Sequence, residues 1–488
     1  MKKAVAGAAV FSYIGGNKQL ESLYDKLLQY REKGIYPFHM PGHKRQEWTM
    51  CNPYEIDITE IEGFDDLHHP EGILRQAQEE AAEIYGSSRT WFLVNGSTSG
   101  ILSAVGGCVP LKGTILMARN CHKSVLNAVF HRGLRPVCVY PQISGQMGIA
   151  GSILPGDVEK ALDCEPHASA VILVSPTYEG VVSDIRSIAE ITRKKGIPLI
   201  VDEAHGAHFS FGGGFPSSAL KEGADFVIQS LHKTLPSMTQ TAVLHASVNA
   251  RRDWMERVDR CVYLYQSSSP SYILLCAIQR CIQYMAADGS ERMKKYAGNL
   301  ERLRKYLKDL PGIRLAERDE TMWRLDPSKL LISAEGVTGT KLGGLLLQNY
   351  GLQMEMCTES FVIAMTSLMD TDQGFKRLCR ALKEIGCESS GLGERRVRDA
   401  CLEESHRPKY RMTPYKAESS PSEWLPLEQA AGRVSAETGY LYPPGVAFIV
   451  AGEEIDDMVI NRLSRYRQKC IEVQGCSRIG EGLLRVVK

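Results

Sequence analysis

The sequence has no excess of charge of either sign and no long apolar segment. Lys and Arg total 58, Asp and Glu total 57, and the formal net charge is +1. A nucleic-acid-binding surface normally needs a surplus of basic residues, and a membrane-spanning helix needs about 20 consecutive apolar residues. We therefore expect no nucleic-acid partner and no membrane partner.

The sequence also lacks the cysteine pattern of a disulfide framework. Its 14 cysteines are scattered from Cys51 to Cys476, and no two of them form a C-x-x-C pair. This usage is typical of reduced, buried thiols. Residues 1–11, Met1-Lys2-Lys3 followed by an apolar stretch, loosely imitate a signal peptide. The cysteine usage favours a cytoplasmic protein instead.

Short apolar runs, separated by helical patterns, dominate the first half of the chain. Such runs indicate strands of a mainly parallel sheet that is buried on both faces. We therefore predict an α/β fold with a seven-stranded sheet, whose ligands should lie at the carboxyl ends of the strands. The predicted strands are Trp91–Asn95, Thr114–Ala118, Pro136–Tyr140, Val171–Ser175, Leu199–Asp202, Phe226–Ser230 and Ala242–His245.

The remaining segments suggest several domains. An amphipathic helix is predicted over Asn17–Lys33, and two long helices over Tyr272–Ala286 and Arg292–Leu310. Residues 386–422 have few large apolar groups and are rich in Glu, Arg, Ser and Pro, which is typical of an exposed connector. The predicted organisation is a helical segment 1–35, a large domain 36–300, a small α+β domain 301–385, a connector 386–422 and a C-terminal domain 423–488.

The most informative segment carries a lysine and a carboxylate at two strand ends. Asp202 ends one strand, and Lys233 follows Ser230 at the end of the next. Pyridoxal phosphate needs such groups, because a lysine amine forms a Schiff base with its aldehyde and a buried carboxylate pairs with its pyridinium nitrogen. Either residue alone could be a helix cap or a surface ion-pair partner. The pair with its companions favours the cofactor site.

Two further segments fit the same cofactor. After the first strand, Val94 to Gly100 form a glycine turn and a helix start with three hydroxyls, where a phosphate group can bind backbone N–H groups. Ser and Thr also cap helices that bind nothing. After the second strand, His122 could place a flat imidazole on the cofactor ring, although a single His is often only structural.

At this point the sequence resembles the Orn/Lys/Arg decarboxylase family. The resemblance implies a fold-type I enzyme that uses pyridoxal 5'-phosphate to decarboxylate a basic amino acid (arginine, lysine or ornithine), with a homodimer or higher homo-oligomer whose active sites form between subunits. It covers most of residues 18–250 and resumes in the C-terminal domain. The residues that carry it are Pro37–Lys44, Asp65–Gly72, Asn95–Ser99, Arg119–Ser124, Pro176–Gly180, Asp202–His205, Ser230–Lys233, Tyr442–Gly445 and Gly452–Glu453.

The resemblance also implies roles for individual residues. Lys233 would bind the cofactor covalently, Asp202 would pair with the pyridinium nitrogen, and His122 would stack on the ring. His232 or Lys233 would return the proton to the substrate carbon. The other implied cofactor-binding residues are Ser97, Thr98, Ser99 and Ser230 at the phosphate, Thr177 at the ring hydroxyl, and His205 and His232 beside the ring.

Two departures from the family pattern stand out. Ala118 occupies a position where the family commonly has Asp, which leaves cofactor binding intact. The chain also has no room for the long N-terminal receiver-like domain of the large inducible enzymes, which suggests the short branch of the family.

A basic substrate side chain needs a carboxylate in the pocket. Glu437 is the first candidate because the resemblance places its stretch near the site. The acidic residues Glu60, Glu62, Asp65 and Asp66 are the second, although each could be solvated surface charge.

Three alternatives stay open from the sequence. An aminotransferase or a carbon–sulfur lyase would need an Arg that holds the substrate carboxylate, for which Arg324 and Arg433 are candidates. A non-catalytic regulator on the same fold could lose Lys233 or Asp202, and both are present. No H-E-x-x-H motif or tetrahedral cysteine set occurs, so we predict no metal site.

Overall fold

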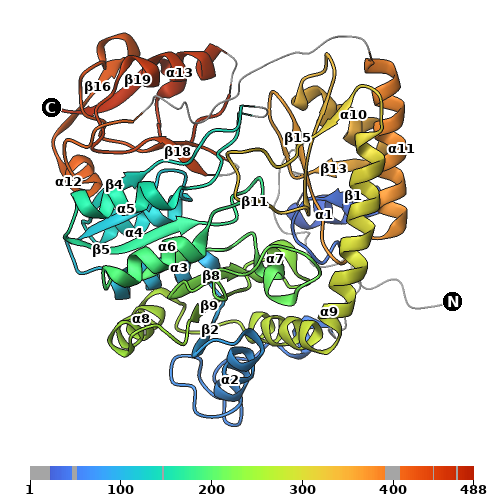
Figure 1. Cartoon of the computed structure of the whole chain (residues 1–488), viewed down its shortest axis with the longest axis horizontal. Coiled ribbons are helices and arrows are strands. Elements are labelled where there is room, and N and C mark those ends of the chain that lie inside the picture. The colour runs from blue at the N-terminus through green and yellow to red at the C-terminus, as the bar shows by residue number, and fades with distance from the viewer. Residues whose placement is uncertain (1–21, 47–51, 146–147, 391–406, 443–444, 469–470) are drawn as a thin grey trace, which may run out of the picture.

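A computed structural model describes residues 22–46, 52–145, 148–390, 407–442, 445–468 and 471–488. Figure 1 shows a large domain built on a central sheet, with a small domain above it at the right and a C-terminal domain above it at the left. We call residues 313–389 the small domain and residues 407–488 the C-terminal domain. Among the described residues, no helix combines the length and the apolar character needed to span a bilayer.

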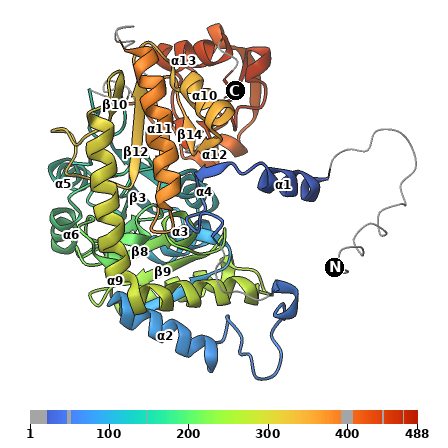
Figure 2. The same cartoon turned by 90° about the vertical axis from the view of Figure 1, so that its right-hand side faces the viewer.

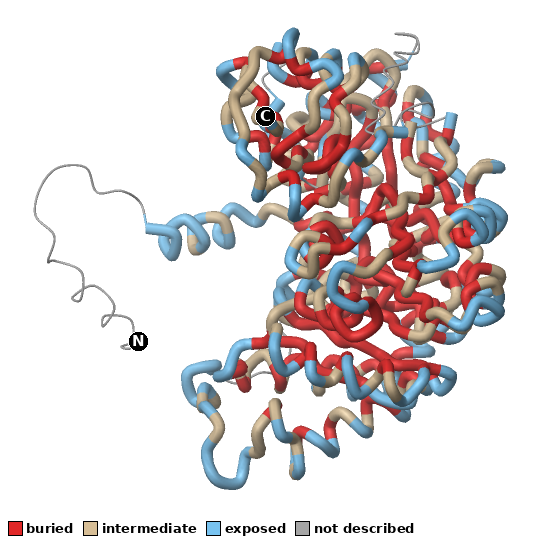
Figure 3. The backbone as a smooth tube through the Cα atoms, turned by 90° about the vertical axis from the view of Figure 1, so that its left-hand side faces the viewer, coloured by how far each residue is buried: buried red, intermediate tan, exposed pale blue. Residues whose placement is uncertain are grey.

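The large domain contains the predicted seven-stranded sheet. The spatial order is β2-β9-β8-β7-β5-β3-β4, and only β9 runs antiparallel to its neighbours. The central strands β7 and β8 are buried along their whole length because helices cover both faces of the sheet. Figure 3 shows the buried backbone gathered in the interior of the molecule. The strands are β2 (Arg89–Leu93), β3 (Thr114–Ala118), β4 (Arg135–Val139), β5 (Ala168–Val174), β7 (Leu199–Asp202), β8 (Phe226–Ser230) and β9 (Ala242–Ala246).

Small residues let helices approach each other closely beside this sheet. At Gly107 in α3, an added Cβ would lie 2.4 Å from the Val258 side chain and 2.5 Å from the Val258 backbone nitrogen in α8. The helices of the large domain are α2 (Ile73–Tyr85), α3 (Gly96–Cys108), α4 (Lys123–His131), α5 (Pro155–Cys164), α6 (Ile185–Lys194), α7 (Leu231–Thr234) and α8 (Arg252–Tyr265).

One long helix, α9 (Tyr272–Lys308), connects the large domain to the small domain. The two separate helices predicted for this region are therefore wrong. Gly289 lies in the predicted gap, but tertiary packing overrides its weak helix propensity. A domain boundary at residue 300 would fall inside this helix, and the domain limits remain a prediction.

The small domain is an antiparallel sheet covered by helices. Its strand order is β10-β12-β15-β14, and β13 (Leu352–Met354) pairs in parallel with β1 (Tyr36–Phe38) from the N-terminal region. β11 (Arg324–Leu325) pairs with β6 (Val181–Val182) of the large domain. The remaining elements are β10 (Ile313–Leu315), β12 (Lys329–Ala334), α10 (Gly339–Tyr350), β14 (Met356–Cys357), β15 (Val362–Met365) and α11 (Asp372–Ser389).

The C-terminal domain has its own apolar core, which includes Phe448, Leu463 and Leu484. β16 (Ser422–Pro426) pairs antiparallel with β19 (Leu483–Val487), and β17 (Gly439–Leu441) pairs with β18 (Val446–Ile449). Its helices are α12 (Pro414–Ser419) and α13 (Asp457–Gln468). The predicted connector is only partly described: α11 extends to Ser389, and residues 391–406 lie outside the described residues.

The N-terminal helix α1 (Leu23–Glu32) projects away from the body of the molecule (Figure 2). None of its residues is buried. The predicted helix over Asn17–Lys33 is present from Leu23 onward, and its first residues, 17–21, lie outside the described residues.

Candidate active site

Lys233 lies in α7, directly after the central strand β8. Its Nζ is 2.9 Å from Nε2 of His205, which follows the neighbouring strand β7. Burial lowers the pKa of Lys233, although the negative charges of Asp202 and Glu355 partly oppose this shift. The lysine is therefore more readily neutral, and so more nucleophilic, than an exposed one.

Asp202 is the last residue of β7 and is 3% exposed. Its Oδ1 accepts a hydrogen bond from the Ala204 backbone N–H at 3.1 Å. Burial raises the pKa of Asp202, and the nearby charge of Lys233 opposes that rise. A buried carboxylate of this kind can hold a cationic ring nitrogen, because a positive partner restores its ionised form.

Two of the predicted hydroxyls meet where β2 and β8 end. Ser97 in the first turn of α3 and Ser230 at the end of β8 lie with their Oγ atoms 2.5 Å apart. Gly96 before Ser97 has φ +71°, so the turn that opens α3 favours glycine. Thr98 is exposed in the same turn, and Ser99 is buried and donates to the Gly96 carbonyl at 2.8 Å. The start of α3 thus offers hydroxyl and backbone donors to an anion.

Three histidines surround the lysine, and burial lowers the pKa of each. The pKa of His122, the N-cap of α4, falls to about 4, and the charge of Lys233 contributes to this shift. The pKa of His232 also falls to about 4, and that of His205 lies well below its ordinary value. His232 Nδ1 is 3.0 Å from the Thr241 carbonyl. All three imidazoles are neutral near pH 7.

Thr177 follows β5 and is buried. Its Oγ1 accepts a hydrogen bond from the Val181 backbone N–H at 3.2 Å, which closes a tight loop. The same loop carries Tyr178, whose ring packs edge-on against His205 with centroids 5.0 Å apart. Thr177 therefore lies beside the site and stabilises the loop that contacts His205.

Residues 21–317 match the family model of the Orn/Lys/Arg decarboxylase major domain, and residues 396–475 match that of its C-terminal domain. This chain belongs to the Orn/Lys/Arg decarboxylase family. It is accordingly a pyridoxal-phosphate-dependent amino-acid decarboxylase, and the resemblance seen in the sequence is confirmed.

Relatives in this decarboxylase family match along almost the whole chain. The uncharacterized protein YaaO of Bacillus subtilis is 35% identical over 95% of this chain and 98% of its own length. Proteins named arginine decarboxylase in Bacillus subtilis and Bacillus anthracis are 30% and 29% identical, and each match covers 96% of this chain and 97% of the relative.

Solved decarboxylase structures share the fold. The constitutive lysine decarboxylase of E. coli superposes with a TM-score of 0.73 at 18% identity, over 91% of this chain and 80% of that one. Lysine decarboxylase A of Pseudomonas aeruginosa gives 0.75 at 16% identity, over 95% and 82%. The predicted fold class, fold-type I with a seven-stranded, mainly parallel sheet, is confirmed.

The side chains of the decarboxylase site fit pyridoxal phosphate. They combine a buried amine, a buried carboxylate, paired hydroxyls at a helix start and neutral imidazoles. Nδ1 of His205 and Oγ1 of Thr234 are buried and have no hydrogen-bond partner among the described residues. Nε2 of His205 lies 2.9 Å from Nζ of Lys233, so the unpaired Nδ1 of the same ring is compatible with a polar ligand at this site. Within the described part of the chain, no group of three or more metal-binding side chains is present.

The structure does not link the predicted substrate carboxylates to Lys233. Glu437 accepts a hydrogen bond from the Arg485 backbone N–H at 3.1 Å and lines a pocket of about 350 Å³ within the C-terminal domain. Asp65 accepts hydrogen bonds from backbone N–H groups of residues 66, 71, 72, 74 and 75 at 2.9, 3.0, 2.8, 3.0 and 3.4 Å, and so caps α2. Asp66 accepts one from the His68 backbone.

Glu355, between β13 and β14, was missed by the sequence analysis. Its Oε1 accepts a hydrogen bond from the Tyr178 hydroxyl at 2.7 Å, and its Oε2 accepts one from the Met40 backbone N–H at 2.8 Å. Its charge also acts on Lys233. The only local signal is a single acidic residue between two apolar ones, Met354 and Met356, a pattern too common to reveal a site.

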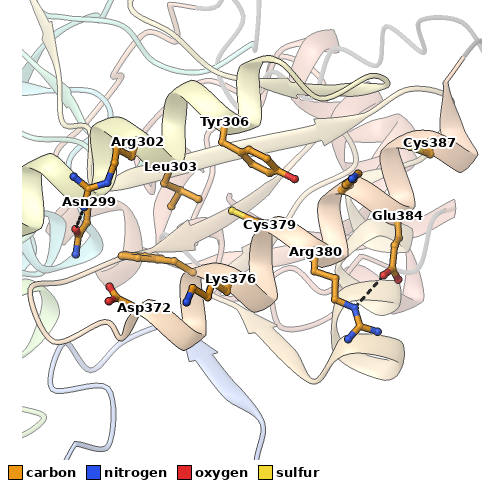
Figure 4. Close-up of a pocket in the computed structure, with 12 residues that line it drawn as sticks. Asn299, Arg302, Leu303, Tyr306, Asp372, Lys376, Cys379, Arg380, Glu384 and Cys387 are labelled. Carbon is orange, nitrogen blue, oxygen red and sulfur yellow. Dashed lines mark hydrogen bonds and ion pairs between the residues drawn. The ribbon is translucent and has the colours of Figure 1, made fainter.

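A groove of about 900 Å³ lies between α9 and α11, away from these residues (Figure 4). Its walls carry Arg302, Tyr306, Lys376 and Arg380, and Arg380 is paired with Glu384. None of the predicted site residues lines it. The groove is therefore not part of the candidate active site.

Proposed function

We propose that this chain decarboxylates a basic amino acid with bound pyridoxal phosphate, and that arginine is the substrate to test first. The observation that carries the proposal is the buried Lys233, 2.9 Å from His205 and close enough to Asp202 for the two charges to shift each other's pKa. The names of several relatives at about 30% identity support arginine over lysine and ornithine.

Residues from several helices and strands would bind different parts of the cofactor. We propose that Ser97, Ser230 and the N–H groups at the start of α3 hold the phosphate, with Thr98 at the rim. Ser99 supports this turn through its bond to Gly96. When bound, the cofactor supplies an electron-accepting ring that stabilises the negative charge left on a substrate carbon after loss of CO2.

The chain's own residues determine where protons are held during the reaction. Asp202 keeps a proton at the ring nitrogen, and the neutral His122 presents a flat face without adding positive charge near Lys233. His205 is positioned by Lys233 and by Tyr178. We propose that Lys233, or His232 once it has taken up a proton, would supply the proton that replaces the lost carboxylate on the substrate carbon.

Glu355 is our proposed partner for the cationic end of the substrate. A carboxylate has about four lone-pair sites, so the bonds from Tyr178 and Met40 leave room for a guanidinium or an ammonium group. The two bonds also fix the orientation of the carboxylate. Charge-assisted hydrogen bonds to a fixed carboxylate are stronger than neutral ones, so Glu355 can select for a basic side chain.

We also propose a homodimer in the cytoplasm. Leu23, Tyr24 and Leu27 on the projecting helix α1 are 74%, 69% and 57% exposed. Large apolar residues gathered on one projecting element are typical of a subunit interface. The location rests on the cysteine usage of the sequence alone.

The experiment that tests the proposed function is a substrate panel. Purified protein with pyridoxal phosphate is incubated with arginine, lysine or ornithine, and CO2 and the product amine are quantified. The proposal predicts stoichiometric CO2 and amine, with the highest kcat/KM for arginine. Keto-acid formation without CO2, in a parallel incubation that also contains an α-keto acid as amino acceptor, would contradict it and support an aminotransferase.

The structure gives the aminotransferase alternative little support. Arg433 is bound within the C-terminal domain, where its Nη2 donates to Glu423 and to the Val487 carbonyl, both at 2.8 Å. Arg324 is an exposed residue of β11. Neither contacts the Lys233 cluster through a described hydrogen bond, so neither is favoured as a clamp for a substrate carboxylate.

A further inference from the structure

A buried ion pair joins the C-terminal domain to the end of strand β3. Arg119 directly follows β3, and Glu453 lies shortly after β18. Nη2 of Arg119 is 3.2 Å from Oε2 of Glu453, and the two side chains are 4% and 0% exposed. Most other ion pairs in the described residues lie at the surface, where such pairs contribute little.

The same two side chains fix strand β18 near both of its ends. Nη1 of Arg119 donates to the Ala447 carbonyl at 2.5 Å. Oε2 of Glu453 accepts a hydrogen bond from the Val450 backbone N–H at 2.8 Å. β18 therefore cannot shift along the large domain without breaking charge-assisted hydrogen bonds.

The beginning of β18 lies directly against His122. Val446 forms a β-bridge with His122, and the Gly445 carbonyl accepts a hydrogen bond from the Lys123 N–H at 3.0 Å. A Cβ on Gly445 would lie 3.2 Å from Cδ2 and 3.3 Å from Nε2 of His122, and Gly445 has φ +85°. The backbone of the C-terminal domain thus packs against one side of the His122 imidazole.

We propose that Arg119 and Glu453 are positioning residues that orient His122 for cofactor binding through β18. The C-terminal domain then completes the cofactor site, although it supplies none of the side chains predicted to bind the cofactor. This inference rests on the proposed function, because it takes His122 as the residue that lies on the pyridoxal ring.

The test is a titration of the apo-protein with pyridoxal phosphate, read by visible absorbance and visible circular dichroism. Glu453→Gln should bind the cofactor about 10-fold more weakly than wild type and give a reduced dichroism band. The matched control is Glu454→Gln, which removes the neighbouring carboxylate from its partly exposed pair with Arg411 and should bind as wild type does. If the ion pair is purely structural, Glu453→Gln should lower the unfolding temperature and leave the cofactor dissociation constant unchanged.

A second comparison shows whether the pair acts through His122. In a His122→Ala background, Glu453→Gln should cause no further loss of cofactor affinity, because residues that act through one another are not additive. Arg119→Lys keeps the positive charge but cannot contact both the Ala447 carbonyl and Glu453 as the guanidinium does. If Glu453→Gln does not fold, Arg119→Lys replaces it in both experiments.

Either additive losses or a wild-type dissociation constant in folded Glu453→Gln would overturn the inference alone. Wild-type protein that binds no pyridoxal phosphate would overturn the proposed function, and this inference with it.

Discussion

At the residue scale, the site is made of ionisable groups whose pKa values burial shifts toward the neutral form. Lys233 has a lowered pKa and Asp202 a raised one, each because the side chain is desolvated, and each partly restores the charge of the other. The histidines around them are neutral. Such opposed shifts in one cluster are typical of catalytic sites.

The proposed role of Glu355 gives a direct prediction at this scale. Glu355→Gln keeps the shape of the side chain but removes the charge, so KM for arginine should rise about 10- to 100-fold while kcat falls less. Steady-state kinetics measure both values. Glu437→Gln serves as the comparison: if it raises KM and Glu355→Gln does not, the assignment made from the sequence is right and ours is wrong.

At the element scale, the strand ends assemble the site and a loop holds it in place. The loop of residues 39–44 lies between α7 and the small domain. The Gly42 N–H donates to the His232 carbonyl at 2.7 Å, and the Gly42 carbonyl accepts from Ser367 Oγ at 2.6 Å. Lys44 is buried, and its Nζ donates to the carbonyls of Pro37, His39 and Met365. The loop therefore couples the small domain to the turn that carries Lys233.

A methyl group at Gly42 should disturb that coupling. A Cβ there would lie 2.7 Å from the Leu235 carbonyl oxygen at the end of α7. We expect Gly42→Ala to destabilise the protein by about 1–3 kcal/mol and to lower kcat, because the backbone next to Lys233 must move.

Urea unfolding and steady-state kinetics measure the two effects. The matched control is Gly156→Ala in α5, where nothing lies within 4 Å of the added methyl. Equal stability and activity for the two variants would contradict the role of the loop.

Site residues that follow a local sequence pattern can be predicted from the sequence, whereas residues that reach the site through contacts distant in the chain cannot. Asp202 and Ser230 end neighbouring strands and Lys233 follows Ser230 in α7, so the periodicity that locates the strands also locates these residues. Glu355 and Lys44 reach their partners across the large and small domains, and no local pattern marks either residue. The resemblance singles out the stretch around Glu437, but a resemblance along the chain does not by itself place a side chain in space, so the role of Glu437 stays a prediction.

At the scale of the whole molecule, buried histidines make the folded state sensitive to acid. Burial lowers the pKa of His245 to about 3, and those of His122 and His232 to about 4. In the unfolded chain each has an ordinary pKa near 6.5. Below that pH the unfolded state binds protons that the folded state does not, so stability present above about pH 6.5 is lost as the pH falls toward 4.

His245→Gln tests this linkage. The free energy of unfolding of wild type should fall between pH 6.5 and 5, and the variant should lose about 1 kcal/mol per pH unit less than wild type. Urea titrations at several pH values give the slopes. Equal slopes for His245→Gln and wild type would contradict the pKa shift.

The proposed dimer is also a property of the whole molecule. Leu27→Glu places a charge on the exposed apolar side of α1 and should convert the dimer to monomers at micromolar concentration. Sedimentation velocity measures the mass. Lys26→Gln, on the same helix, should leave the mass unchanged. A wild-type monomer, or a dimer that Leu27→Glu does not weaken, would count against this interface.

The central claim is that Lys233 binds pyridoxal phosphate covalently. The most direct measurement is borohydride reduction of the protein with bound cofactor, followed by proteolysis and peptide mass spectrometry. The account predicts a cofactor adduct on the peptide that contains Lys233, lost in Lys233→Ala. An adduct on a different lysine, or no adduct in cofactor-saturated wild type, would contradict the account.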